Sequence, residues 1–123
     1  MNLPEIQTTN IQSYLDKEEI ILETIQQIMK DFGMFGVDIQ FSGSPDQAYP
    51  VLHRQLVGQV RELLAGNSDL LMSILYQVDI SDRDMARTEA FFPDYNKVEL
   101  IAHEIIFRDL KKVLFRRYFK LRG

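Results

Sequence analysis

Apolar residues in the first third of the chain recur at three- and four-residue intervals, the spacing that places side chains on one face of an α-helix. Thr9 or Asn10 can cap such a helix, and Gly33 is a typical residue after its last turn. The apolar face comprises Ile11, Tyr14, Leu15, Ile21, Leu22, Ile25, Ile28, Met29 and Phe32. The opposite face carries Asp16, Glu19, Glu23, Gln27 and Asp31. The pattern predicts an amphipathic helix from about residue 10 to residue 33.

Three further helices are expected in the middle of the chain. Pro50 disfavours a helical Tyr49, so we expect a regular helix over 50–65, ended by Gly66. The next helix is capped by the 67–69 segment, and a short polar helix over 82–90 begins at a capping-box pattern over 81–84. The expected inner positions are Leu52, Leu56, Val60, Leu63 and Leu64, followed by Leu70, Leu71, Ile74, Leu75 and Val78.

Residues 37–41 alternate apolar and polar side chains with a period of two, which is typical of an extended segment. The chain offers no obvious strand to pair with it, and an isolated strand leaves its backbone groups unsatisfied. The segment is therefore either a packed loop or a strand that pairs with a second copy of the protein. We prefer the packed loop.

The last helix, predicted over about 96–121, has an apolar face that changes direction along its length. Val98, Ile101, Ala102, Ile105 and Ile106 share one side, whereas Leu110, Val113, Leu114, Tyr118 and Leu121 lie on a side rotated by about a quarter turn. Phe115 and Phe119 form a further apolar strip. The end of this helix must contact more than the core of its own domain, or else expose aromatic side chains to water.

These patterns predict an all-α fold: a single-domain bundle of four to five helices with a long C-terminal helix, spanning residues 1–123. Hydrophobic residues make up 46% and charged residues 26% of the chain, as in ordinary globular domains. No cysteine is present, which excludes disulfides and thiolate metal sites. The sequence shows neither a signal-peptide pattern nor an apolar run long enough to span a membrane, so a cytoplasmic protein is expected.

Charge is distributed unevenly along the chain. Residues 106–123 carry seven basic side chains and one acid, for a local charge of +6. Because the whole chain has a formal charge of -4, residues 1–105 carry -10. The basic residues are Arg108, Lys111, Lys112, Arg116, Arg117, Lys120 and Arg122. Basic residues at a helix C-terminus complement the helix dipole, but the aromatic residues interleaved with them indicate an interaction surface.

Four polar residues are candidates for a chemical role. Glu18 lies within the first apolar face, where we expect it to reach solvent or to pair with an arginine. We expect His53 to be a core residue hydrogen-bonded to a backbone carbonyl rather than a ligand. Glu99 and His103, four residues apart, suit two metal ligands, but the rest of a di-iron pattern is missing. A surface contact between them is the preferred interpretation.

The sequence contains no phosphate-binding loop, nucleophile elbow or dinucleotide fingerprint, and the zinc-protease pattern that starts at His103 fails at Phe107. We therefore expect no catalytic residue, no cofactor and no enzymatic activity. The preferred hypothesis is a helical interaction module that binds a protein partner or itself, as a homodimer. Its predicted binding residues are Lys112, Phe115, Arg116, Arg117 and Phe119. Nucleic-acid binding through the same basic patch is one alternative, and a metal site formed by Glu18, Glu99 and His103 is the other.

Overall fold

The computed structural model describes residues 18–39, 41 and 48–122, apart from the side chains of 18, 48 and 118–122. Within these residues the chain forms five helices and no strand. They are α2 (Glu18–Gly33), α3 (Ala48–Gly66), α4 (Ser68–Val78), α5 (Asp82–Phe91) and α6 (Lys97–Arg122). The predicted all-α fold with a long C-terminal helix is confirmed.

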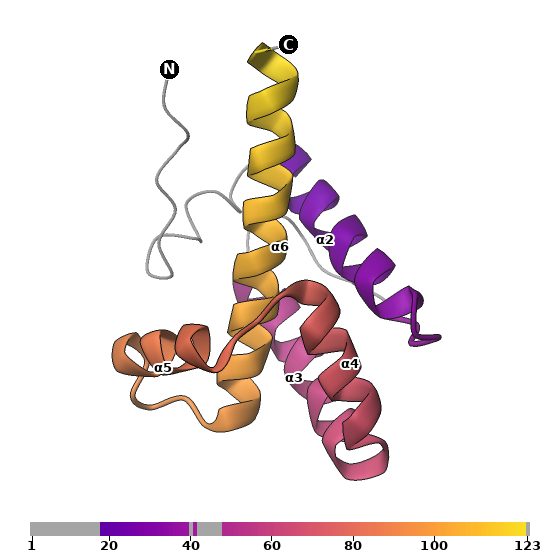
Figure 1. Cartoon of the computed structure of the whole chain (residues 1–123), viewed down its shortest axis with the longest axis vertical. Helices are drawn as coiled ribbons and strands as arrows, with labels where there is room; N and C mark the ends of the chain where they lie inside the picture. The colour runs from indigo at the N-terminus through magenta and orange to yellow at the C-terminus, as the bar shows by residue number, and fades with distance from the viewer. Residues whose placement is uncertain (1–17, 40, 42–47, 123) are drawn as a thin grey trace.

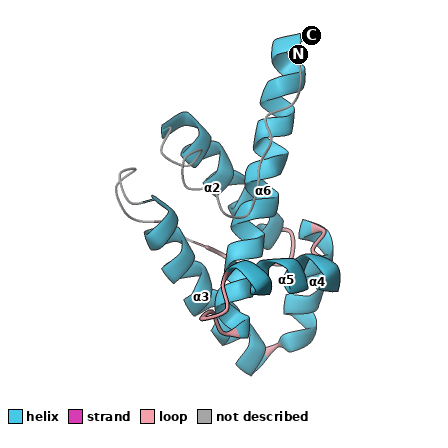
Figure 2. Ribbon diagram, turned by 90° about the vertical axis from the view of Figure 1, so that its left-hand side faces the viewer, coloured by secondary structure: helices cyan, strands magenta, loops and turns pink. Residues whose placement is uncertain are grey.

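Helix α6 is the axis on which the other helices pack. Figure 1 shows α2 leaning against the upper half of α6, while α3, α4 and α5 gather around its lower half. The view in Figure 2 shows α5 lying across α6. Because neighbours approach the lower half from several sides, seven successive residues of α6, 100–106, are buried. This arrangement explains why the apolar residues of α6 do not keep to one face.

The buried apolar side chains form one cluster to which α2, α3, α4 and α6 all contribute. Its fully buried large members are Phe32, Ile21, Ile28, Leu52, Leu56, Leu71, Ile74, Ile105, Ile106 and Leu110. Burial of apolar surface on this scale is the main stabilising contribution in a domain of this size. The core therefore holds α2, α3 and α4 against α6.

Local side-chain caps set the starts of the last three helices. The Asn67 side chain accepts a hydrogen bond from Leu70 N at the start of α4. Ser81 and Asp84 form the predicted capping box at the start of α5. Asn96 and Glu99 exchange the same pair of bonds at the start of α6. Each pair satisfies backbone N–H groups that have no partner within the helix.

The predicted start of the second helix was two residues late. Helix α3 begins at Ala48, so Pro50 lies inside its first turn. The amides of the first turn have no carbonyl partner within the helix, and the missing N–H of a proline therefore costs nothing there.

Residues 37–39 and 41 form a packed loop, as preferred from the sequence. Gly36 adopts a φ of 76°, the left-handed region that glycine enters without a steric penalty, and the turn redirects the chain after α2. Ile39 is buried, while Val37 and Phe41 pack against the core from partly exposed positions. Gln40 and the predicted cap at Thr9 or Asn10 lie outside the described residues.

The prediction for the faces of the first helix was partly wrong. Leu22 and Met29, placed on the apolar face, are 53% and 41% exposed. Gln27 and Asp31, placed on the opposite face, are buried against the C-terminal half of α6. The reason is electrostatic: α6 presents basic side chains there, and these hold the polar side of α2. Ile11, Tyr14 and Leu15 lie outside the described residues, as does the side chain of Glu18.

Candidate functional site

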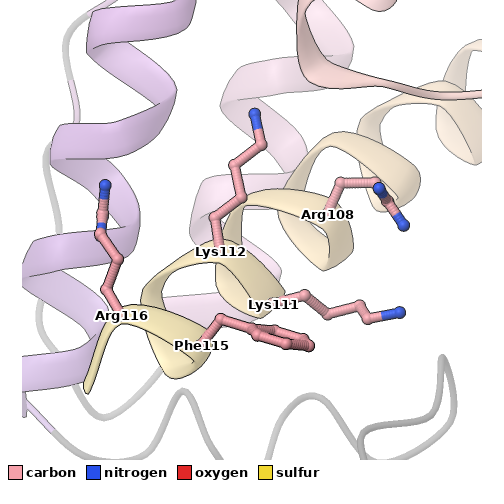
Figure 3. A pocket seen from close by; sticks show the side chains of 5 residues that line it. All are labelled: Arg108, Lys111, Lys112, Phe115 and Arg116. Carbon is pink, nitrogen blue, oxygen red and sulfur yellow. The ribbon is translucent and has the colours of Figure 1, made fainter. Parts of the chain in front are cut away.

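A hollow with a volume of about 540 Å³ lies along the C-terminal half of α6. Its lining consists of Arg108, Lys111, Lys112, Phe115 and Arg116, all from this one helix (Figure 3). Four of the five are cations and none is an acid. Phe115 is 42% exposed, so an aromatic surface lies among the positive charges.

The structure brings together three of the five residues predicted to bind a partner: Lys112, Phe115 and Arg116. Arg117 is not part of the lining, and the side chain of Phe119 lies outside the described residues. Two lining residues, Arg108 and Lys111, were not predicted. They lie seven and four residues before Phe115, the spacing that places them on its face of the helix, so the sequence did contain the signal.

The cations of the hollow divide between two sides of α6. Figure 3 shows Lys112 and Arg116 extending upward, and both contact α2, whereas Arg108 and Lys111 extend to the right, away from it. Phe115 lies between the two sets, with its ring beside Lys111. The aromatic ring therefore lies on the side of the outward cations.

The outward cations are lightly held. Arg108 Nη2 lies 2.9 Å from Asp79 Oδ2, but the Asp79 side chain is 83% exposed. Such an ion pair contributes little to stability, because water screens it. The Lys111 ammonium lies 5.3 Å from the centre of the Phe107 ring, a cation–π contact. Within the described part of the chain, Lys111 has no ion pair. Both cations can therefore turn toward an added anion at small cost.

The inward cations bind α2. Lys112 Nζ lies 3.4 Å from Asp31 Oδ2, and Arg116 Nη1 donates a hydrogen bond of 2.6 Å to Gln27 Oε1. Arg117 Nη2 lies 2.5 Å from Glu23 Oε1, and its Nη1 lies 3.4 Å from Glu19 Oε2. Three residues predicted to bind a partner thus contact the polar side of the protein's own α2.

A pair of buried carboxyl groups lies beneath Lys112. Asp109 is fully buried, Asp31 is 2% exposed, and Lys112 Nζ lies 3.4 Å from Asp109 Oδ1. Burial, followed by hydrogen bonding to and repulsion from Asp31, raises the pKa of Asp109 well above its usual range. Because Asp109 keeps its proton more readily, it can lie beside Asp31, and the Lys112 ammonium balances the charge of the pair.

A second group of polar side chains joins α3 to α6. The Tyr49 hydroxyl lies 2.5 Å from His103 Nδ1 and 3.2 Å from the Tyr95 hydroxyl. Burial first, and then the bond to Tyr95, raises the pKa of Tyr49, so the hydroxyl stays protonated. His53 Nε2 is within 2.9 Å of the backbone oxygen of Glu99, which confirms the predicted bond to a carbonyl.

The preferred interpretation of Glu99 and His103 as a surface contact was wrong. His103 is 1% exposed and bonds Tyr49, while the Glu99 carboxylate caps the start of α6. The sequence showed their spacing on one helix. It could not show that α3 brings Tyr49 against His103 from 54 residues away.

Aromatic rings stack on one another beside these groups. The ring of His53 lies between those of Tyr49 and Tyr95, with centres 5.4 and 5.1 Å away. Phe92 stacks on Tyr95 at 4.8 Å. Because these faces are already covered by one another, the stack serves to fasten α3 and the 92–96 loop to α6. A hollow of about 490 Å³ beside it is lined by Tyr49, Pro50, His53, Arg54, Val57, Tyr95 and Glu99.

Other chemistry finds no support in the described part of the chain. No three acidic or histidine side chains there are arranged to hold a metal ion. None of the helices described combines the length and apolar character that crossing a bilayer requires. The hollow of α6 presents cations and an aromatic ring to solvent with no acid in its lining.

No protein-family model, curated protein or solved structure matches this chain.

Proposed function

We propose that this protein is a non-catalytic interaction module that binds an acidic segment of a protein partner in the hollow of α6. The observation that carries the proposal is the composition of the lining: four cations surround a half-exposed phenylalanine, without an acid among them. An aromatic anchor within a charged rim is the usual composition of a protein-binding hot spot. We also propose that the protein is cytoplasmic.

The inward cations make the site rigid on one side. Arg116 is held by the neutral Gln27 of α2, so it supplies a fixed positive charge that needs no reorganisation when an anion arrives. The Lys112 charge is balanced by the buried carboxyl pair beneath it. Arg108 and Lys111 remain able to contact that anion directly. This division supports binding of an acidic segment along the outer flank of α6.

Self-association through two copies of the hollow is disfavoured, because four cations of one copy would face four of the other. A second copy can act as the partner only through one of its acidic surfaces. Such a contact joins two different surfaces and weakens as salt rises.

The test is binding of a fluorescent, unstructured glutamate-rich peptide and of a single-stranded oligonucleotide of equal charge. The variant Arg108→Glu/Lys111→Glu reverses the outward charges. Arg61→Glu/Arg83→Glu makes the same charge change at exposed positions on α3 and α5 and serves as the matched control. Light scattering after size exclusion, at low and high salt, reports self-association.

Salt-sensitive peptide binding that the outward reversal abolishes, and that the control reversal leaves within about twofold, supports the proposal. Tighter binding of the oligonucleotide than of the peptide replaces it with the nucleic-acid alternative, in which phosphates occupy the hollow. A protein that binds neither probe and is monomeric at both salt concentrations overturns it.

A further inference from the structure

The contact between α2 and α6 shows how polar side chains on one helix can be spaced to meet the basic side chains of α6. The residues of α2 that face it are spaced by four, and they are Glu19, Glu23, Gln27 and Asp31. Each has a basic partner on α6: Arg117 for the first two, Arg116 for the third and Lys112 for the fourth. A spacing of four residues advances about 6 Å along a helix and keeps side chains on one face.

The outer flank of α6 repeats this basic spacing. Arg108, Lys112 and Arg116 are spaced by four, and Lys111 and Phe115 form a parallel row one residue away. The first row is shared, since Lys112 and Arg116 also contact α2. The second row projects on the other side, where Phe115 stays 42% exposed and Lys111 has only the Phe107 ring beneath it. Together with Arg108, which extends away from α2, Lys111 and Phe115 form a second track on α6 beside the one that α2 occupies.

We propose that this second track binds an amphipathic acidic helix of a partner protein, one that repeats the four-residue carboxylate spacing of α2. Its carboxylates pair with Arg108 and Lys111, and an apolar residue one position away packs on Phe115. The inference rests on the proposed function, because it names the kind of acidic segment that the hollow receives.

A helix fits better than an extended acidic segment for a geometric reason. In an extended chain, the side chains on one side form a single row that repeats about every 6 to 7 Å, and the residues between them point to the opposite side. A helix presents its acids and its apolar residues together on one stripe. A preformed stripe also loses less conformational entropy on binding than a flexible chain does.

A second copy of this protein is not the occupant we propose. Its own helix with this spacing, α2, already lies against α6 through Glu23 and Asp31. It also buries Ile21, Ile28 and Phe32 in the core, so releasing it would expose that apolar surface.

The experiment uses three synthetic peptides with the 16-residue length of α2, the first two of identical composition. The first places Glu at every fourth position with Leu beside it, and the second scrambles the order so that no stripe forms. The third keeps the stripe but replaces a central solvent-facing alanine by proline, which breaks the helix. Fluorescence anisotropy with the full chain measures each affinity.

We expect the patterned peptide to bind at least about tenfold more tightly than the other two. Lys111→Glu and Phe115→Ala should each weaken it by about tenfold, while Arg61→Glu changes its affinity by less than twofold. Melting temperatures show that each variant is folded.

Three outcomes overturn the inference, and they are distinguishable. In the first outcome, all three peptides bind equally and the charge reversal of Arg108 and Lys111 abolishes their binding. This rejects a helical partner but leaves the proposed function intact. Failure of all three to bind rejects both. Patterned-peptide binding accompanied by loss of amide-exchange protection over 18–33 shows that the peptide displaces α2, and therefore that the second track is not its site.

Discussion

Lys112 Nζ in α6 lies 3.4 Å from the carboxylate of Asp31 in α2. A side chain that the sequence assigned to a partner surface therefore fastens two helices of the same chain. Asp31 is 2% exposed, and Asp109 lies fully buried beside the same ammonium. The basic end of α6 consequently holds α2 on one side and leaves Phe115 half-exposed on the other.

Removing the Lys112 charge should destabilise the protein. In Lys112→Met the buried carboxyl pair loses its only ion-pair partner within the described residues, and we expect a loss of roughly 2–3 kcal/mol in the free energy of unfolding at pH 7. Urea denaturation measures it. The double variant Asp31→Asn/Lys112→Met should recover most of the loss. If the two single effects simply add, Lys112 does not balance Asp31.

Glu104 makes stability depend on pH. It is 1% exposed and accepts a hydrogen bond from Thr88 Oγ1, and burial, followed by repulsion from Asp84, raises its pKa to about 7. The folded state therefore binds a proton that the unfolded chain releases at about its ordinary value of 4.5. The stabilisation that this proton contributes is fully present below pH 4.5 and is lost as pH rises through 7.

The variant Glu104→Gln, which keeps the oxygen that Thr88 contacts, should remove this dependence. At pH 8 we expect it to be more stable than the parent by about 2–3 kcal/mol, with the difference vanishing near pH 4. Thermal unfolding from pH 4 to 8 measures both curves. Parallel curves would show that Glu104 keeps an ordinary pKa. Asp109 shifts in the same direction, so some slope should remain in the variant.

The Tyr49 hydroxyl should contribute to the junction of α3 and α6. Tyr49→Phe keeps the stacked ring but leaves buried His103 without that hydrogen bond, at a cost of about 1–2 kcal/mol. Tyr76→Phe is the matched control, because Tyr76 is 88% exposed and its hydroxyl should not matter. Equal denaturation midpoints for the two variants would contradict the role of the bond.

Replacing Phe32 should lower stability strongly, whereas replacing Phe115 should lower it little. Phe32 is fully buried in the core, so Phe32→Ala should cost about 3–5 kcal/mol. Phe115 is 42% exposed, and Phe115→Ala should cost about 1 kcal/mol or less. Denaturation midpoints measure both. A large loss in Phe115→Ala would mean that this ring belongs to the core rather than to a binding surface.

Much of the fold could be predicted from local signals. The capping side chains Asn67 and Ser81 act within three or four residues, and they lie where the sequence placed them. Most of the apolar rows of α3 and α4 also holds, since Leu56, Val60 and Ile74 are fully buried. Leu64, predicted to face inward, is 39% exposed near the end of α3. Such features depend on neighbours along the chain and need no knowledge of the tertiary fold.

The candidate site could be predicted only in part. Lys112, Phe115 and Arg116 followed from the aromatic and basic residues alternating near the chain end. The division of the cations into two sets did not, because it depends on where α2 lies. Likewise, Gln27 and Asp31 are spaced as on a solvent-facing side, and only their contact with Arg116 and Lys112 shows that this side is buried.

The sequence by itself determined that the chain is helical, where most of its described helices begin and end, and that its C-terminal helix is basic and aromatic. Only the tertiary structure decided which charges meet: Arg117 with Glu23, Lys112 with Asp31, and Tyr49 with His103. The physical reason is the range of the interactions. Helix periodicity and caps act over a few residues, whereas these pairs join residues 54 to 94 positions apart and form only after the apolar core has packed.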